Sequence, residues 1–150
     1  MGFSTSLAQS DTLRLNNQVI STFANEYCGK LEFPNELVMV DVDKQGNGLL
    51  AINQKGLIAD LDIRIVMAAS DDTYLNSLLA QQTGGSPTIL SAVLTKNFAD
   101  QKGNVTSVQM QLNGGAFLRG IPMILSTSGN IEQTIAVYKF RFANWLRLIL

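Results

Sequence analysis

The acidic, glycine-rich segment at residues 41–48 has the residue types of two kinds of ligand-binding loop. Asp41, Asp43 and Gly46 match positions one, three and six of a calcium-binding EF-hand loop. Position twelve is Ile52, where that loop needs a glutamate that binds calcium through both carboxylate oxygens. A phosphate-binding loop also fails, because no Gly-Lys-Ser/Thr sequence follows at the required spacing. We therefore interpret the segment as a turn or a protruding loop that contacts a neighbouring molecule.

The side chains that serve most often in catalysis and metal binding are scarce in this chain. The sequence has no histidine, which removes the usual general base, the usual zinc ligand and every Ser-His-Asp arrangement. The single cysteine, Cys28, cannot form an intramolecular disulfide or a thiolate metal site. The adjacent carboxylates Asp71 and Asp72 fit the start of a helix better than an acid–base pair. We expect a protein that is not an enzyme and that uses no metal or cofactor.

The rest of the chain mostly alternates apolar and polar residues, which is the pattern of half-buried β-strands. In residues 57–68, Leu61 and Ile63 face one side of the expected strand, and Asp60 and Asp62 face the other. The further segments with this pattern are residues 12–22, 88–95, 105–113 and 134–144. The last of them is rich in aromatic and β-branched residues, which favour strands. The sequence therefore predicts a mainly β protein.

Residues 71–83 depart from this alternation and are typical of one amphipathic α-helix. Ser70 or Asp71 is expected as the N-cap, and Gly84-Gly85 follows the last turn. The apolar stripe of this helix consists of Tyr74, Leu75, Leu78 and Leu79. We expect the stripe to pack over an open end or a face of the sheets. The predicted fold class is mainly β, with two packed antiparallel sheets, as a β-sandwich or barrel, and one flanking α-helix in a single domain of residues 1–150.

Charged side chains are few and balanced. Eleven basic and twelve acidic residues make up 15% of the chain, against about 25% in an ordinary globular protein. The basic residues are scattered and the sequence pI is about 5.3, so the charge pattern of a nucleic-acid-binding surface is missing. No apolar run approaches the roughly 18 residues that cross a membrane, and we expect a soluble protein made in the cytoplasm. Because a soluble monomer normally uses more charge, we expect copies of the chain or a partner to cover much of its surface.

The two ends of the chain differ in character. The last six residues, WLRLIL, are too apolar for a free tail. The candidate subunit-interface residues there are Trp145, Leu146 and Leu148, which we expect to be buried in the domain or against another subunit. The first eleven residues form a polar arm.

The order of these features resembles that of bacteriophage tail tube proteins. The likeness runs from about Gly46 to Arg147, and the segments SDDTYLNSLL and NIEQTIAVYKF carry it best. The resemblance implies a fold similar to the tube subunit of type VI secretion systems, with six copies in a ring and rings stacked into a hollow tube. Its implied partners are further copies of the chain, a tape measure protein and, in a contractile tail, a sheath protein. The implied location is the virion tail, after assembly in the host cytoplasm, and DNA passes through the lumen without sequence-specific binding.

The resemblance also assigns roles to parts of this chain. The N-terminal arm (residues 1–11) and the protruding loop reach an adjacent ring, so shortening the loop should leave a folded subunit that cannot elongate tubes. The loop residues are Asp41, Asp43, Lys44, Gln45, Gly46, Asn47 and Gly48.

The lumen of such a tube should be neutral or acidic, because a basic lining would hold DNA by counterion release. Polar residues on alternating strand positions are the candidates for this surface. The candidate lumen-facing residues are Asp60, Asp62, Ser107, Gln109 and Gln111. Lysines in place of Asp60 and Asp62 should bind DNA inside the tube and slow its ejection.

Several other functions remain open. Within the same structural class, the chain could be the tube subunit of a pyocin-like or type VI secretion apparatus. A small-ligand-binding β-barrel is a second class, although no convergent polar groups mark a ligand site. An enzyme without histidine is a third. Particle size separates the first class from the second, since a tube subunit forms rings or filaments and a ligand-binding barrel stays monomeric.

Overall fold

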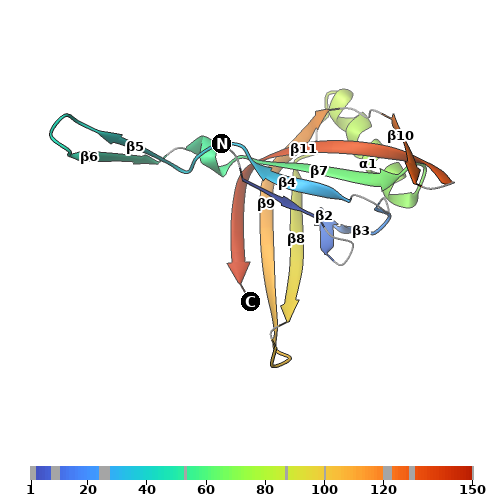
Figure 1. Cartoon of the computed structure of the whole chain (residues 1–150). Coiled ribbons are helices and arrows are strands. Elements are labelled where there is room, and N and C mark those ends of the chain that lie inside the picture. The colour runs from blue at the N-terminus through green and yellow to red at the C-terminus, as the bar shows by residue number, and fades with distance from the viewer. Residues whose placement is uncertain are drawn as a thin grey trace.

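The computed structural model describes residues 3–7, 11–23, 28–52, 54–86, 88–99, 101–119, 123–128 and 131–149. Strands make up most of this part of the chain, together with one α-helix and one short 3-10 helix (Figure 1). The elements are β1 (Phe3–Ser6), β2 (Thr12–Leu15), β3 (Gln18–Ile20), β4 (Gly29–Phe33), β5 (Val38–Val42), β6 (Gly48–Ile52), η1 (Gln54–Leu57), β7 (Ala59–Val66), α1 (Ser70–Thr83), β8 (Leu90–Ala99), β9 (Val105–Arg119), β10 (Met123–Ser128) and β11 (Ile131–Ile149).

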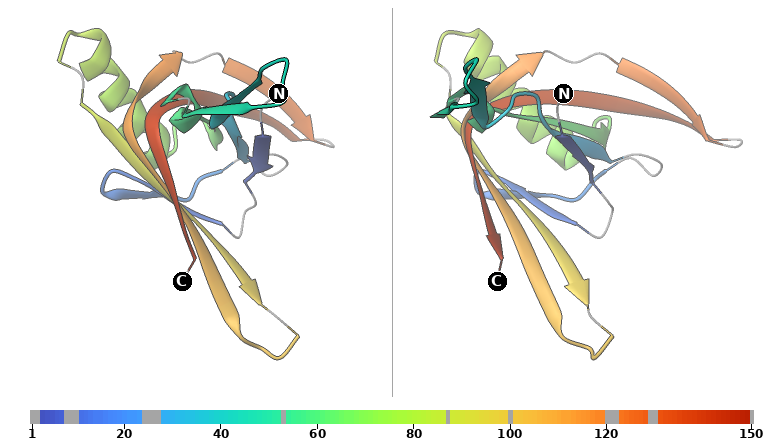
Figure 2. Two further views of the ribbon diagram at one scale, coloured as in Figure 1. Left: turned by 90° about the vertical axis from the view of Figure 1, so that its left-hand side faces the viewer. Right: turned by 60° about the vertical axis from the view of Figure 1, so that its left-hand side comes forward.

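Two antiparallel sheets result, which confirms the predicted mainly β fold with a flanking helix. The larger sheet has the strand order β1-β4-β7-β11-β9-β8-β2-β3, with β10 paired to the start of β11. This sheet curls into a half-barrel (Figures 1 and 2). The smaller sheet contains only β5 and β6, and it projects from the body as a hairpin.

The core lies on the inner face of the curled sheet. Leu61, Ile63 and Ile65 of β7 are fully buried there, as the period-two pattern predicts. From β11, three aromatic side chains join them: Tyr138, Phe140 and Phe142. Their rings pack in series, and Phe117 of β9 contacts Phe140 with ring centroids 4.8 Å apart. Each such side chain contributes roughly 1.5–3 kcal/mol by leaving water, so this aromatic row holds β7, β9 and β11 together.

β9 and β11, the two central strands of the larger sheet, bend at the same level, where the alternation of buried and exposed residues breaks. One residue of β8 lies between Leu90 and Ala92, whereas two residues of β9 lie between their partners Gly115 and Leu112, which is a β-bulge. A Cβ on Gly115 would lie 2.3 Å from ring atoms of Phe142, so only glycine permits this close packing. Beyond the bend, the ends of β8, β9 and β11 project from the half-barrel (Figures 1 and 2).

Helix α1 packs its apolar stripe against the sheet. Leu75 and Leu78 are buried in the core, with Tyr74 and Leu79 packed against it, as the sequence predicts. At the C-terminal end, the side chain of Gln82 donates to the Phe117 carbonyl at 3.0 Å and accepts from the Phe117 N–H at 2.9 Å. These two hydrogen bonds attach the helix to β9.

The predicted N-cap of this helix is wrong. Ser70 is the first helical residue and the cap position is Ala69, which has no side-chain capping bond. Asp72 instead accepts a hydrogen bond from the Ala68 N–H at 2.8 Å. Asp71 does not cap the helix because its side chain turns inward, toward the chain that follows β3.

Asp71 is a buried carboxylate, 2% exposed. It accepts hydrogen bonds from Gln18 in β3 and from Ser21 and Thr22, which follow that strand. Oδ2 accepts from the N–H groups of Ser21 (2.9 Å) and Thr22 (3.0 Å) and from the Thr22 hydroxyl (2.7 Å), and Oδ1 accepts from Gln18 Nε2 (2.9 Å). Burial raises the pKa of Asp71, but the hydrogen bonds from Ser21, Gln18 and Thr22 together outweigh it and hold the pKa below its usual value. The carboxylate therefore ties the edge of the sheet to α1 in its ionised form.

Replacing Asp71 with asparagine should lower the free energy of unfolding by about 1–3 kcal/mol, because an amide NH₂ group then faces buried donors. Since the folded pKa is lowered, the contribution of Asp71 is fully present above its unfolded pKa of about 3.9 and is lost as the pH falls through the folded pKa. Chemical denaturation at pH 7 and at pH 3 measures this. Asp41→Asn, on an exposed strand, is the matched control. An equal loss at both pH values would contradict the assignment.

Candidate functional site: assembly surfaces

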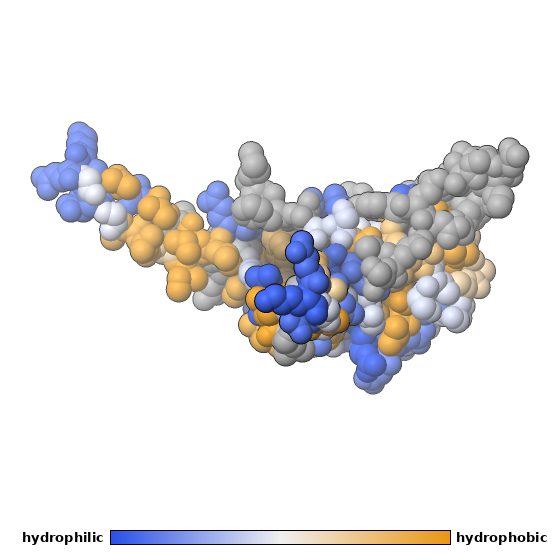
Figure 3. Space-filling model, turned by 60° about the horizontal axis from the view of Figure 1, so that its bottom comes forward, coloured by the Kyte–Doolittle hydropathy of each residue, from blue (hydrophilic) through white to orange (hydrophobic). Residues whose placement is uncertain are grey.

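The hairpin β5–β6 exposes apolar side chains along its whole stem. Leu49 is 73%, Leu50 76% and Ile52 83% exposed, and Val40 of β5 is exposed as well. Figure 3 shows this apolar stem projecting from the body, with a hydrophilic tip. A lone two-stranded hairpin is marginally stable in water, and exposed apolar patches of this kind mark interaction sites. The stem is therefore a candidate assembly surface.

The turn of this hairpin is shorter than the loop expected at residues 41–48. Asp41 pairs with Leu49 and Val42 with Gly48, so both ends of the expected loop belong to strands. The strands extend further than expected because cross-strand pairing outweighs the low strand preference of glycine and aspartate. The residues that remain in the turn are Asp43, Lys44, Gln45, Gly46 and Asn47.

Asp43 organises this turn with its own side chain. Its Oδ1 accepts from the N–H groups of Gln45 and Asn47, both at 2.9 Å, and its Oδ2 accepts from Asn47 Nδ2 at 3.2 Å. The backbone hydrogen bond from Asn47 is the largest of several influences that lower the pKa of Asp43. The carboxylate thus orders the turn by accepting hydrogen bonds from residues two and four positions later in the chain.

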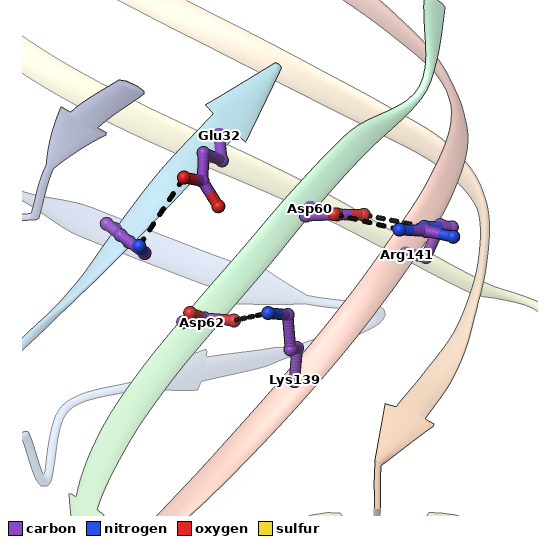
Figure 4. A network of polar contacts seen from close by, with 6 residues as sticks. Glu32, Asp60, Asp62, Lys139 and Arg141 are labelled. Atoms are coloured by element: carbon purple, nitrogen blue, oxygen red, sulfur yellow. Dashed lines mark hydrogen bonds and ion pairs between the residues drawn. The ribbon is translucent and has the colours of Figure 1, made fainter. Parts of the chain in front are cut away.

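A ladder of opposite charges crosses β4, β7 and β11 on the face away from the core (Figure 4). Asp60 binds Arg141 through both oxygens, Oδ1 to Nε at 2.8 Å and Oδ2 to Nη2 at 3.1 Å. The neighbouring row places Asp62 between Lys30 and Lys139, as the strand register requires. Asp60 is only 6% exposed, and Arg141 is the ion-pair partner that balances its charge.

The second row of this ladder is looser than the first. Lys139 Nζ lies 3.9 Å from Asp62 Oδ1, and Lys30 Nζ lies 3.4 Å from Glu32 Oε1. Burial raises the pKa of Asp62, and the opposing effect of Lys139 does not fully offset it. Together with Asp60 and Arg141, the ladder has three acidic and three basic side chains. Arg64 follows Asp60 and Asp62 on the same face of β7, so this face is not acidic.

The polar residues of β9 and the apolar residues of the C-terminal end share one face beyond the bend. Gln111 pairs with Leu146 and Gln109 with Leu148 across β9 and β11. Gln109, Gln111 and Leu148 are half-buried and Leu146 is exposed. Ser107 lies further out, where its hydroxyl donates to Asn97 of β8 at 2.6 Å. The candidate lumen residues of β9 and two candidate interface residues are therefore neighbours on one surface.

Trp145 lies on the other side of β11 and is half-buried within its own chain. Its Nε1 donates to the Gly56 carbonyl at 3.1 Å, and its ring packs against Phe33 with centroids 5.1 Å apart. Both contacts border a groove of about 870 Å³ at the root of hairpin β5–β6. It is lined by Phe33, Asn35, Glu36, Leu37, Val38, Gly56, Trp145 and Arg147. Sequence reasoning missed this groove because β4, the hairpin root, η1 and β11 meet only in the folded chain.

The described residues contain no cluster of three or more His, Cys, Asp or Glu side chains that could hold a metal ion. Cys28 is buried, and burial, followed by the charge of Asp11, raises the pKa of its thiol, so it is a poor nucleophile. Among the described residues no helix is long and apolar enough to span a membrane.

Comparison with known proteins adds no assignment. No family model matches the chain, and no curated protein shows significant sequence similarity to it.

The charge ladder predicts that replacing two neighbouring aspartates affects the free energy of unfolding differently. Asp60→Asn should lower the free energy of unfolding at pH 7 by about 1–3 kcal/mol, because Arg141 loses its charged acceptor. Asp62→Asn should leave it unchanged or raise it, because a raised pKa means that the folded state carries a cost from the ionised carboxylate above the folded pKa. Urea denaturation of both variants at pH 7 measures this. Equal destabilisation by the two substitutions would contradict it.

Proposed function

We propose that this chain is a structural subunit of a bacteriophage tail tube, which self-assembles into stacked rings of six copies around a channel for DNA. The observation that carries the proposal is the projecting hairpin β5–β6, whose stem is apolar and exposed. The resemblance of the sequence to tail tube proteins and the mainly β fold with one helix support it.

The exposed stem favours assembly because it is too far from the core to be covered by its own chain. Leu49, Leu50 and Ile52 would each gain roughly 1.5–3 kcal/mol on full burial. The chain's net charge of −1 opposes the close approach of further copies only weakly. A tube subunit uses both properties, since its stability comes from contacts with neighbouring copies.

Neither candidate channel surface has a large net charge. The ladder on β4, β7 and β11 is balanced, Arg64 adds one positive charge beside it, and Gln109 and Gln111 on β9 are neutral. By strand register the two surfaces lie on opposite faces of the sheet, because their partners on β11 occupy odd and even positions respectively. Duplex DNA carries one negative charge per roughly 1.7 Å and binds tightly to basic surfaces. A balanced or neutral wall lets DNA pass without being held. This is the property that the proposal requires of the lumen.

The groove at the hairpin root favours one alternative function. Its volume of about 870 Å³ falls within the range of small-molecule sites, and most of its walls are apolar. A monomeric protein that binds an apolar ligand there would have this feature. Particle size separates the two functions, because the ligand-binding protein needs no further copies.

The apolar stem predicts which substitutions prevent assembly. Leu50→Asp combined with Ile52→Asp should give a folded protein that stays monomeric, because the carboxylates would be buried in the subunit contact. Light scattering and negative-stain microscopy measure the particles, and circular dichroism checks the fold. Ile89→Asp, 77% exposed but outside the hairpin, is the matched control. Tubes of normal length from the double variant would refute the role of the hairpin.

The neutral channel wall predicts how DNA binding changes. Gln109→Lys with Gln111→Lys should yield tubes that bind a short duplex, with an affinity that falls steeply with salt. Gln109 and Gln111 test the channel wall better than Asp60 does, because replacing Asp60 also removes its ion pair with Arg141. Asn76→Lys with Ala80→Lys adds the same charge to the exposed face of α1 and should not retain DNA. Equal binding by both pairs would place β9 outside the lumen.

A further inference from the structure

The groove at the root of hairpin β5–β6 combines apolar side chains with two charged ones, Arg147 and Glu36. Phe33 and Trp145 line it as half-buried residues, and Val38 lines it as an exposed one. Glu36 already has a partner within the chain, whereas Arg147 is exposed and no acidic group among the described residues forms an ion pair with it. A complementary ligand would therefore be apolar and would carry one carboxylate beside its apolar group.

The far half of the same hairpin presents that pair of groups. Asp41 of β5 and Leu49 of β6 are cross-strand partners, so their side chains lie next to each other on one face. Leu49 is exposed, and the carboxylate of Asp41 accepts only the N–H of the next residue, Val42, at 3.1 Å. No basic side chain in the described part of the chain forms an ion pair with Asp41.

A chain cannot place its own Asp41 and Leu49 in its own groove. Along β5, Val38 and Asp41 are three residues apart, which a strand holds at about 10 Å. Successive side chains alternate between faces, so Asp41 points to the opposite side from Val38, which lines the groove. The two complementary surfaces can meet only between two copies.

We infer that the groove at the hairpin root of one copy receives Leu49 of the hairpin of a second copy, with Asp41 of that hairpin paired to Arg147. The inference rests on the proposed self-assembly and names the two surfaces that meet. Donor and acceptor are different surfaces, so each contact leaves one hairpin and one groove free. Such a head-to-tail contact repeats into a closed ring or an open filament, as a tube requires.

A charge exchange tests the pairing. Asp41→Lys and Arg147→Glu should each raise the protein concentration needed for assembly by about tenfold or more, because like charges would then meet in the contact. The two substitutions together should restore assembly to within about threefold of wild type. Asp41→Lys with Arg14→Glu has the same net charge as the exchanged pair but lacks the complementary partner, and should not restore it. Sedimentation at low salt measures all four variants.

A covalent link tests the geometry independently. In a Cys28→Ser background, Leu37→Cys with Leu49→Cys should form disulfides between chains on oxidation and give a ladder of oligomers on a denaturing gel. Ile89→Cys with Leu49→Cys is the matched control and should give no ladder.

The outcomes separate this inference from the proposed function. If wild type forms tubes but the exchanged pair assembles as poorly as the single variants, the groove is not the acceptor and the tube proposal stands. If the exchange restores only a closed dimer, in which two copies fill each other's grooves, the inferred contact between Asp41 and Arg147 is supported and the proposed tube is refuted. If wild type stays monomeric at high concentration, both fail.

Discussion

The bend shared by β9 and β11 separates the buried core from the surface that Gln111 and Leu146 share. Before the bend, β11 buries Tyr138, Phe140 and Phe142 in the half-barrel; after it, the strand leaves the core and presents Leu146 beside Gln111. Gly115 makes the bend possible because no side chain separates its backbone from the Phe142 ring. A side chain at position 115 would collide with the Phe142 ring, so this approach of β9 to β11 requires glycine.

The fold combines a well-packed body with projections that are poorly stabilised by their own chain. The half-barrel holds the aromatic row, the Asp71 hydrogen bonds and the stripe of α1, whereas the stem of β5–β6 has no such support. An exposed apolar hairpin promotes association, and if nothing restricts that association it leads to aggregation. The polar turn ordered by Asp43 limits aggregation at one end of the hairpin. Specific contact with another copy would limit aggregation along the stem.

The described charged groups differ in how far the chain itself pairs them. Asp60 is paired with Arg141, Lys96 binds Asp11 at 2.7 Å, and Asp71 accepts hydrogen bonds from neutral donors. The chain as a whole has a net charge of −1, so long-range repulsion between copies would be weak. Asp41 on the hairpin and Arg147 at the groove form no ion pair among the described residues, and they have opposite signs.

The sequence by itself determined the strands within residues 12–22, 57–68, 88–95, 105–113 and 134–144, the helix over residues 71–83 and the burial of Leu61 and Ile63. These depend on the period of apolar residues along a short stretch of chain. It did not determine that Asp71 points inward, that the hairpin extends past Asp41, or that Gln111 and Leu146 share a face. Each of these depends on a partner at least eight residues away in the sequence, most of them far more distant, and on a strand register that only the folded sheet establishes. The groove between Phe33, Val38 and Trp145 is the clearest case. Its walls come from β4, the hairpin root, η1 and β11, and β11 is far from the other three in the sequence and meets them only in the folded chain.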